Sequence, residues 1–211
     1  MRKNSKDAIV DAAITLFNIK GFTGTSIRDI ANKANINVAN ISYYFDNKHG
    51  LLEHCFTIFF ESYLHEIEKG YSNADLSATI ALKEMSKNII QYQSKNVHLT
   101  RFILREISID SQVIREIMST YFVKERFFFK EVLEKGMKTG EFRNLSINYT
   151  IMQWKALLAM PYLNSQYARE VLQIFPNEEY FADKYTSEIN NWIDTVITNP
   201  FMEQKLMVVN Q

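Results

Sequence analysis

Several side chains that can hydrogen-bond to nucleic acid lie close together near residue 40. The amide of Asn40 and the hydroxyl of Ser42 can pair with the edges of bases, and Val38 can contact the methyl group of a thymine. The phenol groups of Tyr43 and Tyr44 are long enough to reach phosphate oxygens. The residue types and their spacing therefore predict hydrogen bonding to DNA.

Two short helices separated by a tight turn are needed to position these side chains. Thr25 or Ser26 can cap the first helix, whose apolar residues recur at helical spacing: Ile27, Ile30, Ala31 and Ala34. Asn37 can cap the second helix, whose inner face is formed by Val38, Ile41 and Phe45. A short helix that enters the major groove needs such an apolar inner face and a polar outer face. The same periodicity also fits two helices that are only part of an all-helical core.

Residues 21–31 (GFTGTSIRDIA) and 41–45 (ISYYF), followed by Lys48, resemble the N-terminal domain of the TetR family of transcriptional regulators. The resemblance implies that the first helix contacts phosphates, that the second enters the major groove, and that Lys48 grips the DNA backbone. It places the DNA contacts at Thr25, Ser26, Arg28, Asn37, Val38, Asn40, Ser42, Tyr43, Tyr44 and Lys48.

Two positions depart from the usual residues of that family. Ala39 stands where Gly is common, and Ser42 stands where Tyr is frequent. Both residues are compatible with DNA binding, but they leave the operator sequence open. The turn-rich residues that follow the second helix predict two domains: 1–47, a helix-turn-helix DNA-binding domain, and 48–211, a helical regulatory and dimerisation domain.

Composition and charge fit this division. The chain of 211 residues is 46% hydrophobic, which is enough for a substantial core, and its formal net charge is +0. The first fifty residues carry seven Lys and Arg against four Asp, so the remainder is slightly acidic. A basic excess at one end predicts phosphate contact confined to that end, although a solvated surface gives the same count.

Helical periodicity continues to the end of the chain, and no β pattern or repeat interrupts it. We therefore predict an all-α protein with a long helix over 51–69 that acts as a lever between the two domains, and a final helix over 178–198. Two late helices have wide apolar faces, and in the resembled family the corresponding helices pair in a homodimer. The predicted dimer interface comprises Trp154, Leu158, Ile189, Trp192, Ile193 and Val196.

Chemistry other than DNA binding has little support in the sequence. The four histidines, His49, His54, His65 and His98, lack the spacing of metal ligands, and Cys55 lies in an apolar helix where packing is its expected role. No catalytic motif or phosphate-binding glycine loop is present. We predict a protein that is not an enzyme, has no cofactor or metal, and is cytoplasmic and nucleoid-associated, since no apolar run is long enough to span a membrane.

An effector pocket is a further possibility that relatives suggest. Aromatic and methionine residues of the C-terminal region could line one: Phe102, Met118, Phe122, Phe127, Phe128, Phe129, Trp154 and Met160. Such residues at helical spacing are more often ordinary core, and we predict no ligand.

Three arginines, Arg101, Arg105 and Arg115, lie in a distinctive run over 99–121. They can form surface ion pairs with Glu106 and Glu116, or they can form a surface that docks a protein partner.

The run 99–121, together with 41–45 and 160–163, resembles the RefZ proteins of spore-forming bacilli. That resemblance implies binding to a few palindromic chromosomal sites and modulation of the tubulin-like division protein FtsZ during sporulation. Two alternatives stay open: a conventional ligand-responsive repressor of the TetR type, and a helical interaction module that has lost DNA binding.

Overall fold

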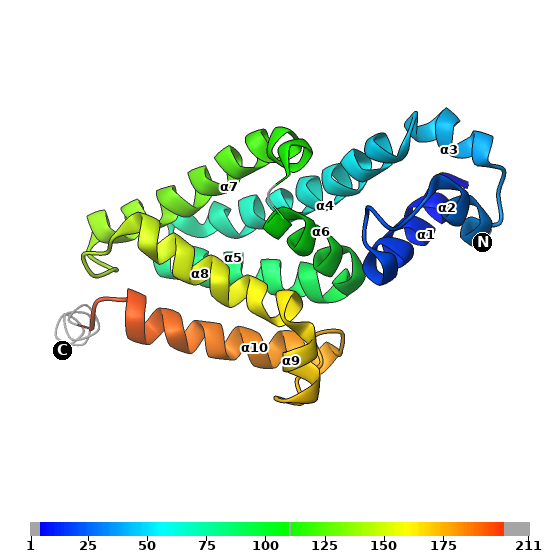
Figure 1. Ribbon diagram of the computed structural model, residues 1–211. Helices are drawn as coiled ribbons and strands as arrows, with labels where there is room; N and C mark the ends of the chain where they lie inside the picture. The colour runs from blue at the N-terminus through cyan, green and yellow to red at the C-terminus, as the bar shows by residue number, and fades with distance from the viewer. Residues whose placement is uncertain (1–4, 110, 201–211) are drawn as a thin grey trace. The chain divides into compact units, whose positions relative to one another are not determined.

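The computed structural model describes residues 5–109 and 111–200, and within these ranges the regular structure is helical (Figure 1). The α-helices are α1 (Ser5–Lys20), α2 (Ile27–Ala34), α3 (Val38–Phe45), α4 (Lys48–Tyr71), α5 (Ala78–Lys95), α6 (Val97–Ile109), α7 (Gln112–Thr139), α8 (Ile147–Leu163), α9 (Ser165–Glu170) and α10 (Glu179–Trp192). A 3₁₀ turn spans Ser72–Asp75, and a π-helical turn spans Ile193–Ile197. The predicted all-α class is confirmed.

The chain divides into two compact units. Unit 1 contains the residues up to 61 together with 96–118, and unit 2 contains 62–95 and the residues from 119 onward. The sequence-based domain boundary at residue 47 therefore lies inside unit 1. Helices α4 and α7 each contribute residues to both units.

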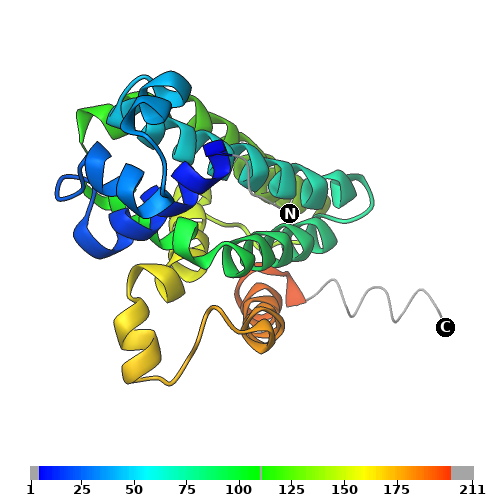
Figure 2. The same cartoon turned by 90° about the vertical axis from the view of Figure 1, so that its right-hand side faces the viewer.

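Unit 1 is built around the three N-terminal helices, which pack against one another and lie together in both views (Figures 1 and 2). Helix α1 buries Ile9, Ala13 and Phe17 completely, as its periodicity predicts. Helix α6 packs against α1, where the rings of Phe17 and Phe102 stack with centroids 4.9 Å apart. The predicted three-helix unit is thus completed by a helix that follows it by more than fifty residues.

Unit 2 is centred on Trp154 of α8, which is fully buried. Its indole nitrogen donates a hydrogen bond to Ser86 Oγ at 3.0 Å, and its ring lies 4.2 Å from the ring of Phe129. Helix α5 packs against both α8 and α10. Gly70 allows α4 to approach α5 closely, because a Cβ there would lie 2.5 Å from the backbone nitrogen of Met85.

The burial in unit 2 contradicts most of the predicted dimer interface. The side chains of Trp154, Leu158, Ile189 and Ile193 are at most 3% exposed in the single chain, because unit 2 uses them as its own core. A second subunit cannot cover side chains that are already covered. Of the six predicted residues, Trp192 is half-buried and Val196 is exposed.

Pro161 lies inside α8. A proline in a helix has no N–H for the carbonyl four residues earlier, here that of Leu157. The hydroxyl of Tyr185 donates to that carbonyl at 2.7 Å and replaces the missing donor. The segment after α8 contains the short helix α9.

Glu141, in the connector between α7 and α8, caps the N-terminus of α5. Its carboxylate accepts hydrogen bonds from the backbone N–H groups of Ala78 and Thr79, at 3.0 and 2.9 Å, and from the hydroxyl of Ser77. These N–H groups belong to the first turn of a helix, where they have no partner within the helix. The cap therefore fixes α5 to the end of α7.

This cap should make stability depend on pH. Burial raises the pKa of the Glu141 carboxyl, but the hydrogen bonds from Ser77, Thr79 and Ala78 outweigh burial and lower that pKa from 4.5 to about 2. The stabilisation is complete above pH 4.5 and is lost as pH falls toward 2. We expect the free energy of unfolding, measured by urea titration across this range, to fall more steeply in the wild type than in Glu141→Gln. Parallel curves would contradict the capping role.

Candidate nucleic-acid interface

The N-terminus of α2 is fixed by a capping box. Ser26 Oγ accepts a hydrogen bond from the backbone N–H of Asp29 at 3.1 Å, and the Asp29 carboxylate accepts one from the backbone N–H of Ser26 at 2.9 Å. The backbone and hydroxyl hydrogen bonds from Ser26 lower the pKa of Asp29. Ile30 and Ala31 are buried beneath the helix, while Arg28 is exposed on its outer side.

The turn between α2 and α3 has a defined backbone conformation. Asn35 adopts a left-handed conformation (φ 53°), which ends α2, and the next N–H, of Ile36, bonds to the carbonyl of Ala31 at 3.0 Å. Asn37 then caps α3, because its side-chain oxygen accepts a hydrogen bond from the N–H of Ala39 at 2.9 Å. Of the two candidates Thr25 and Ser26, Ser26 is the cap of α2, and the predicted cap at Asn37 is confirmed.

Helix α3 has two chemically different faces. Ile41 and Phe45 are buried and hold the helix to unit 1. On the outer side, Tyr43 is 83% exposed and its ring meets the ring of Tyr44 edge-on at 5.0 Å. Ser42 is also exposed and Asn40 is half-buried, while Val38, predicted for the inner face, is 38% exposed. The exposed face therefore offers hydroxyl, amide and apolar groups together.

Thr25 does not have the phosphate-contacting role that the resemblance implies. Its side chain is 1% exposed, and its hydroxyl donates a hydrogen bond to the carbonyl of Gly21 at 2.8 Å. The buried hydroxyl therefore stabilises the turn between α1 and α2.

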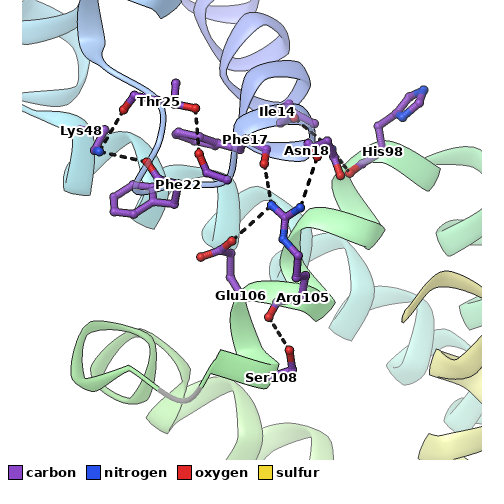
Figure 3. Close-up of polar contacts among 11 residues, drawn as sticks. Ile14, Phe17, Asn18, Phe22, Thr25, Lys48, His98, Arg105, Glu106 and Ser108 are labelled. Atoms are coloured by element: carbon purple, nitrogen blue, oxygen red, sulfur yellow. Dashed lines mark hydrogen bonds and ion pairs between the residues drawn. The ribbon is translucent and has the colours of Figure 1, made fainter. Parts of the chain in front are cut away.

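Lys48, at the start of α4, also points inward (Figure 3). Its Nζ donates to the carbonyls of Phe22 and Thr25, each at 3.0 Å, and lies 4.4 Å from the centroid of the Phe22 ring. The cation thus ties α4 to the turn between α1 and α2. The expected contact of Lys48 with the DNA backbone stays a prediction, and in this structure the cation is hydrogen-bonded within the protein.

The three arginines of the predicted partner surface differ in their surroundings. Arg105 is turned toward α1, where it donates to the carbonyls of Phe17 and Asn18, and it forms an ion pair with the buried Glu106 at 3.3 Å (Figure 3). The ion pair with Glu106, one of the two alternatives for these arginines, is present, but Glu106 is buried and not on a solvated surface, and the guanidinium is occupied on the inner side. Arg115 is exposed and Arg101 is half-buried.

A groove of about 330 Å³ lies between α7 and α8, lined by Phe122, Glu125, Arg126, Asn148, Ile151 and Lys155. The buried Glu125 carboxylate accepts a hydrogen bond from the Tyr63 hydroxyl at 2.8 Å and pairs with Lys155. Burial, together with the charge of Glu125, raises the pKa of Tyr63 well above 10. Of the residues expected to be core, Phe102, Met118, Phe129 and Trp154 are fully buried, whereas Phe122, Phe127 and Met160 are exposed.

Metal ligands, membrane spans and the cysteine were three further features to locate in the part of the chain that the structure describes. No group of His, Cys, Asp and Glu there could hold a metal ion, and no helix there is long and apolar enough to cross a membrane. Cys55 is fully buried, and burial raises the pKa of its thiol to about 12, as fits a packing role.

Residues 9–55, which contain most of α1, all of α2 and α3, and the start of α4, match the family model for bacterial regulatory proteins of the tetR family. The chain is 46% identical over 197 residues to the probable HTH-type transcriptional regulator YttP of Bacillus subtilis (strain 168). That match covers 93% of this chain and 95% of the relative.

Two solved structures have a similar fold. HlyIIR, a hemolysin II transcriptional regulator, superposes with a TM-score of 0.67 at 26% identity over 89% of this chain and 98% of its own. The ketosteroid transcriptional regulator KstR2 of Mycobacterium tuberculosis gives a TM-score of 0.77 at 14% identity, over 94% of this chain and 97% of its own, and shows a common fold alone. The helix-turn-helix geometry, the matched residues and the near full-length relative agree: the chain belongs to the TetR family of bacterial transcriptional regulators.

Proposed function

We propose that this protein binds palindromic DNA sites as a homodimer and that α3 is the helix that enters the major groove. The observation that carries the proposal is the contrast between the two faces of α3. Its inner residues Ile41 and Phe45 are buried, while Tyr43 and Ser42 are exposed at the surface. A helix held in this way can place its outer side chains against base edges.

Helix α2 supplies the phosphate contacts in this proposal. Ser26 and Arg28 are exposed at its N-terminal turn, where unpaired backbone N–H groups and the helix dipole favour a phosphate. Arg28 adds a cation with a forked set of donors. Asn37 and Tyr44 complete the proposed surface on the side of α3.

The dimer is supported by an apolar stripe on α8 that unit 2 leaves uncovered. Its members recur at intervals of three and four residues, and all are exposed: Tyr149, Met152, Ala156, Met160 and Leu163. This stripe occupies a different face of α8 from Trp154 and Leu158, which unit 2 buries. A second copy related by a two-fold axis would cover it, and two-fold symmetry matches a palindrome with half-sites about one helical turn apart.

Substitutions of Asn37 can separate its role as the cap of α3 from its proposed contact with DNA. Asn37→Asp keeps an oxygen for the Ala39 N–H, so we expect stability within about 0.5 kcal/mol of the wild type. The carboxylate repels phosphate, so affinity for duplexes recovered from the host chromosome should fall about tenfold or more. Asn37→Ala, the matched control for the cap, should lose about 1 kcal/mol of unfolding free energy. Wild-type affinity in Asn37→Asp would place Asn37 outside the interface.

Arg28 provides a test of phosphate contact. Arg28→Ala should weaken binding to all duplexes alike and reduce the slope of log affinity against log salt by about 1, because one phosphate contact is lost. Fluorescence anisotropy over a salt series measures this slope. Arg169→Ala, which removes an exposed arginine of α9, should leave the slope unchanged. An unchanged slope in Arg28→Ala would refute its assigned contact.

We further propose that DNA binding modulates FtsZ ring assembly during sporulation, through a surface that includes Arg101 and Arg115. The support is the resemblance of the run 99–121 to the RefZ proteins, together with the exposure of Arg115. Arg105 is left out of this surface because its guanidinium contacts α1.

Mapping of bound sites in the native host, with division-ring position recorded in the same cells, tests this role. We expect a few palindromic sites spread over the chromosome and displaced rings when the protein is deleted. A single site beside a promoter, with normal rings, would instead identify a conventional repressor. The α7–α8 groove, where Phe122 and Ile151 lie beside charged side chains, favours that alternative and would be the place to search for its ligand.

A further inference from the structure

The connection between α1 and α2 is held from outside by two cationic side chains (Figure 3). Arg105 of α6 contacts the last turn of α1, at Phe17 and Asn18, where the connection starts, and Lys48 of α4 contacts the connection itself, at Phe22 and Thr25. All the acceptors are main-chain carbonyl oxygens. The two side chains therefore restrain the path of the backbone itself, whatever side chains it carries.

Arg105 meets two carbonyls at the end of α1. Phe17 and Asn18 belong to its last turn, where carbonyls have no donor within the helix, and the Phe17 carbonyl also accepts a hydrogen bond from the N–H of Gly21, just past the helix, at 2.9 Å. Arg105 Nη2 donates to Phe17 O at 2.6 Å, and Nη1 donates to Asn18 O at 3.3 Å, so the guanidinium spans the helix end. The negative end of the helix dipole favours this position for a cation. Gly21, with φ 76°, ends the helix directly after it.

Lys48 fixes the other end of the connection. The carbonyl of Thr25, one of its two acceptors, immediately precedes Ser26, the N-cap of α2. Arg105 at the end of α1 and Lys48 on the connection together form a clamp on the backbone that leads from α1 into α2. Helix α2 packs against α1, and α3 packs against both.

We propose that Arg105 is a positioning residue for DNA binding, which acts from α6 by holding the connection between α1 and α2 in the geometry that presents α2 and α3. The inference rests on the proposed function. This positioning role replaces the role of Arg105 in docking a protein partner, because docking would require its guanidinium to face that partner.

Helix α6 stays attached to α1 without Arg105. His98, Phe102 and Arg105 lie at i, i+4 and i+7 on the side of α6 that faces α1. The Phe102 ring stacks on Phe17, and the Asn18 amide donates to the carbonyl of His98 at 2.8 Å. Loss of the guanidinium should therefore loosen the connection without unfolding unit 1.

The experiment compares the full-length wild type with Arg105→Ala and Arg105→Lys, with Arg169→Ala as the matched control on α9. Amide hydrogen exchange is measured without DNA, and affinity is measured for duplexes recovered from the host chromosome. We expect Arg105→Ala to exchange faster at residues 17–27 alone and to bind about tenfold more weakly, as for one lost hydrogen bond from a charged donor. Arg105→Lys should recover part of the affinity, because an ammonium can serve one carbonyl but cannot span two.

Three results would overturn the inference. They are equal affinity of the wild type and Arg105→Ala, unchanged exchange at 17–27, and faster exchange throughout the chain, which would mean general destabilisation. If Arg105→Ala does not fold, full wild-type affinity in Arg105→Lys with faster exchange at 17–27 would also refute it. Failure of the wild type to recover any duplex would refute the proposed function instead, and the exchange data would still test the clamp.

Discussion

The surface proposed to contact DNA depends on holding an eight-residue helix in place. A helix of this length is marginal in water on its own, because nucleation fixes several residues before many hydrogen bonds form. Helix α3 is stabilised by the Asn37 cap and by burial of Ile41 and Phe45. Full burial of one such side chain contributes about 1.5–3 kcal/mol. The rest of unit 1 provides the core against which this burial occurs.

A second constraint is that main-chain carbonyls need hydrogen-bond donors. Long side chains that are distant in the sequence supply such donors repeatedly. Arg105 donates to the last turn of α1, Lys48 donates to the connection that follows it, and Tyr185 donates to Leu157 where Pro161 cannot. The capping box at Ser26 and the Glu141 cap of α5 do the same for N–H groups. Buried backbone groups without partners cost free energy, so these contacts define how helices can be joined.

The sequence predicted well what depends on neighbouring residues. The 3.6-residue periodicity located the long helices, and local capping rules identified Ser26 and Asn37. Periodicity could not tell which apolar face unit 2 would bury, so Trp154 and Leu158 were assigned to a partner. Contacts between distant residues had no local signal: Arg105 meets Phe17, 88 positions away, and Lys48 meets Phe22, 26 positions away. The family pattern predicts a contact between Lys48 and the DNA backbone, because the pattern specifies a residue type but not its rotamer.

The most direct measurement is selection of duplexes from a randomised library by the full-length protein, followed by sequencing. The account predicts enrichment of one sequence in two inverted copies, whose centres lie about one helical turn apart, as a two-fold pair of α3 helices requires. Enrichment of an unrepeated sequence would contradict the dimeric arrangement. No enrichment over the starting library would contradict the assignment of α3 as a recognition helix.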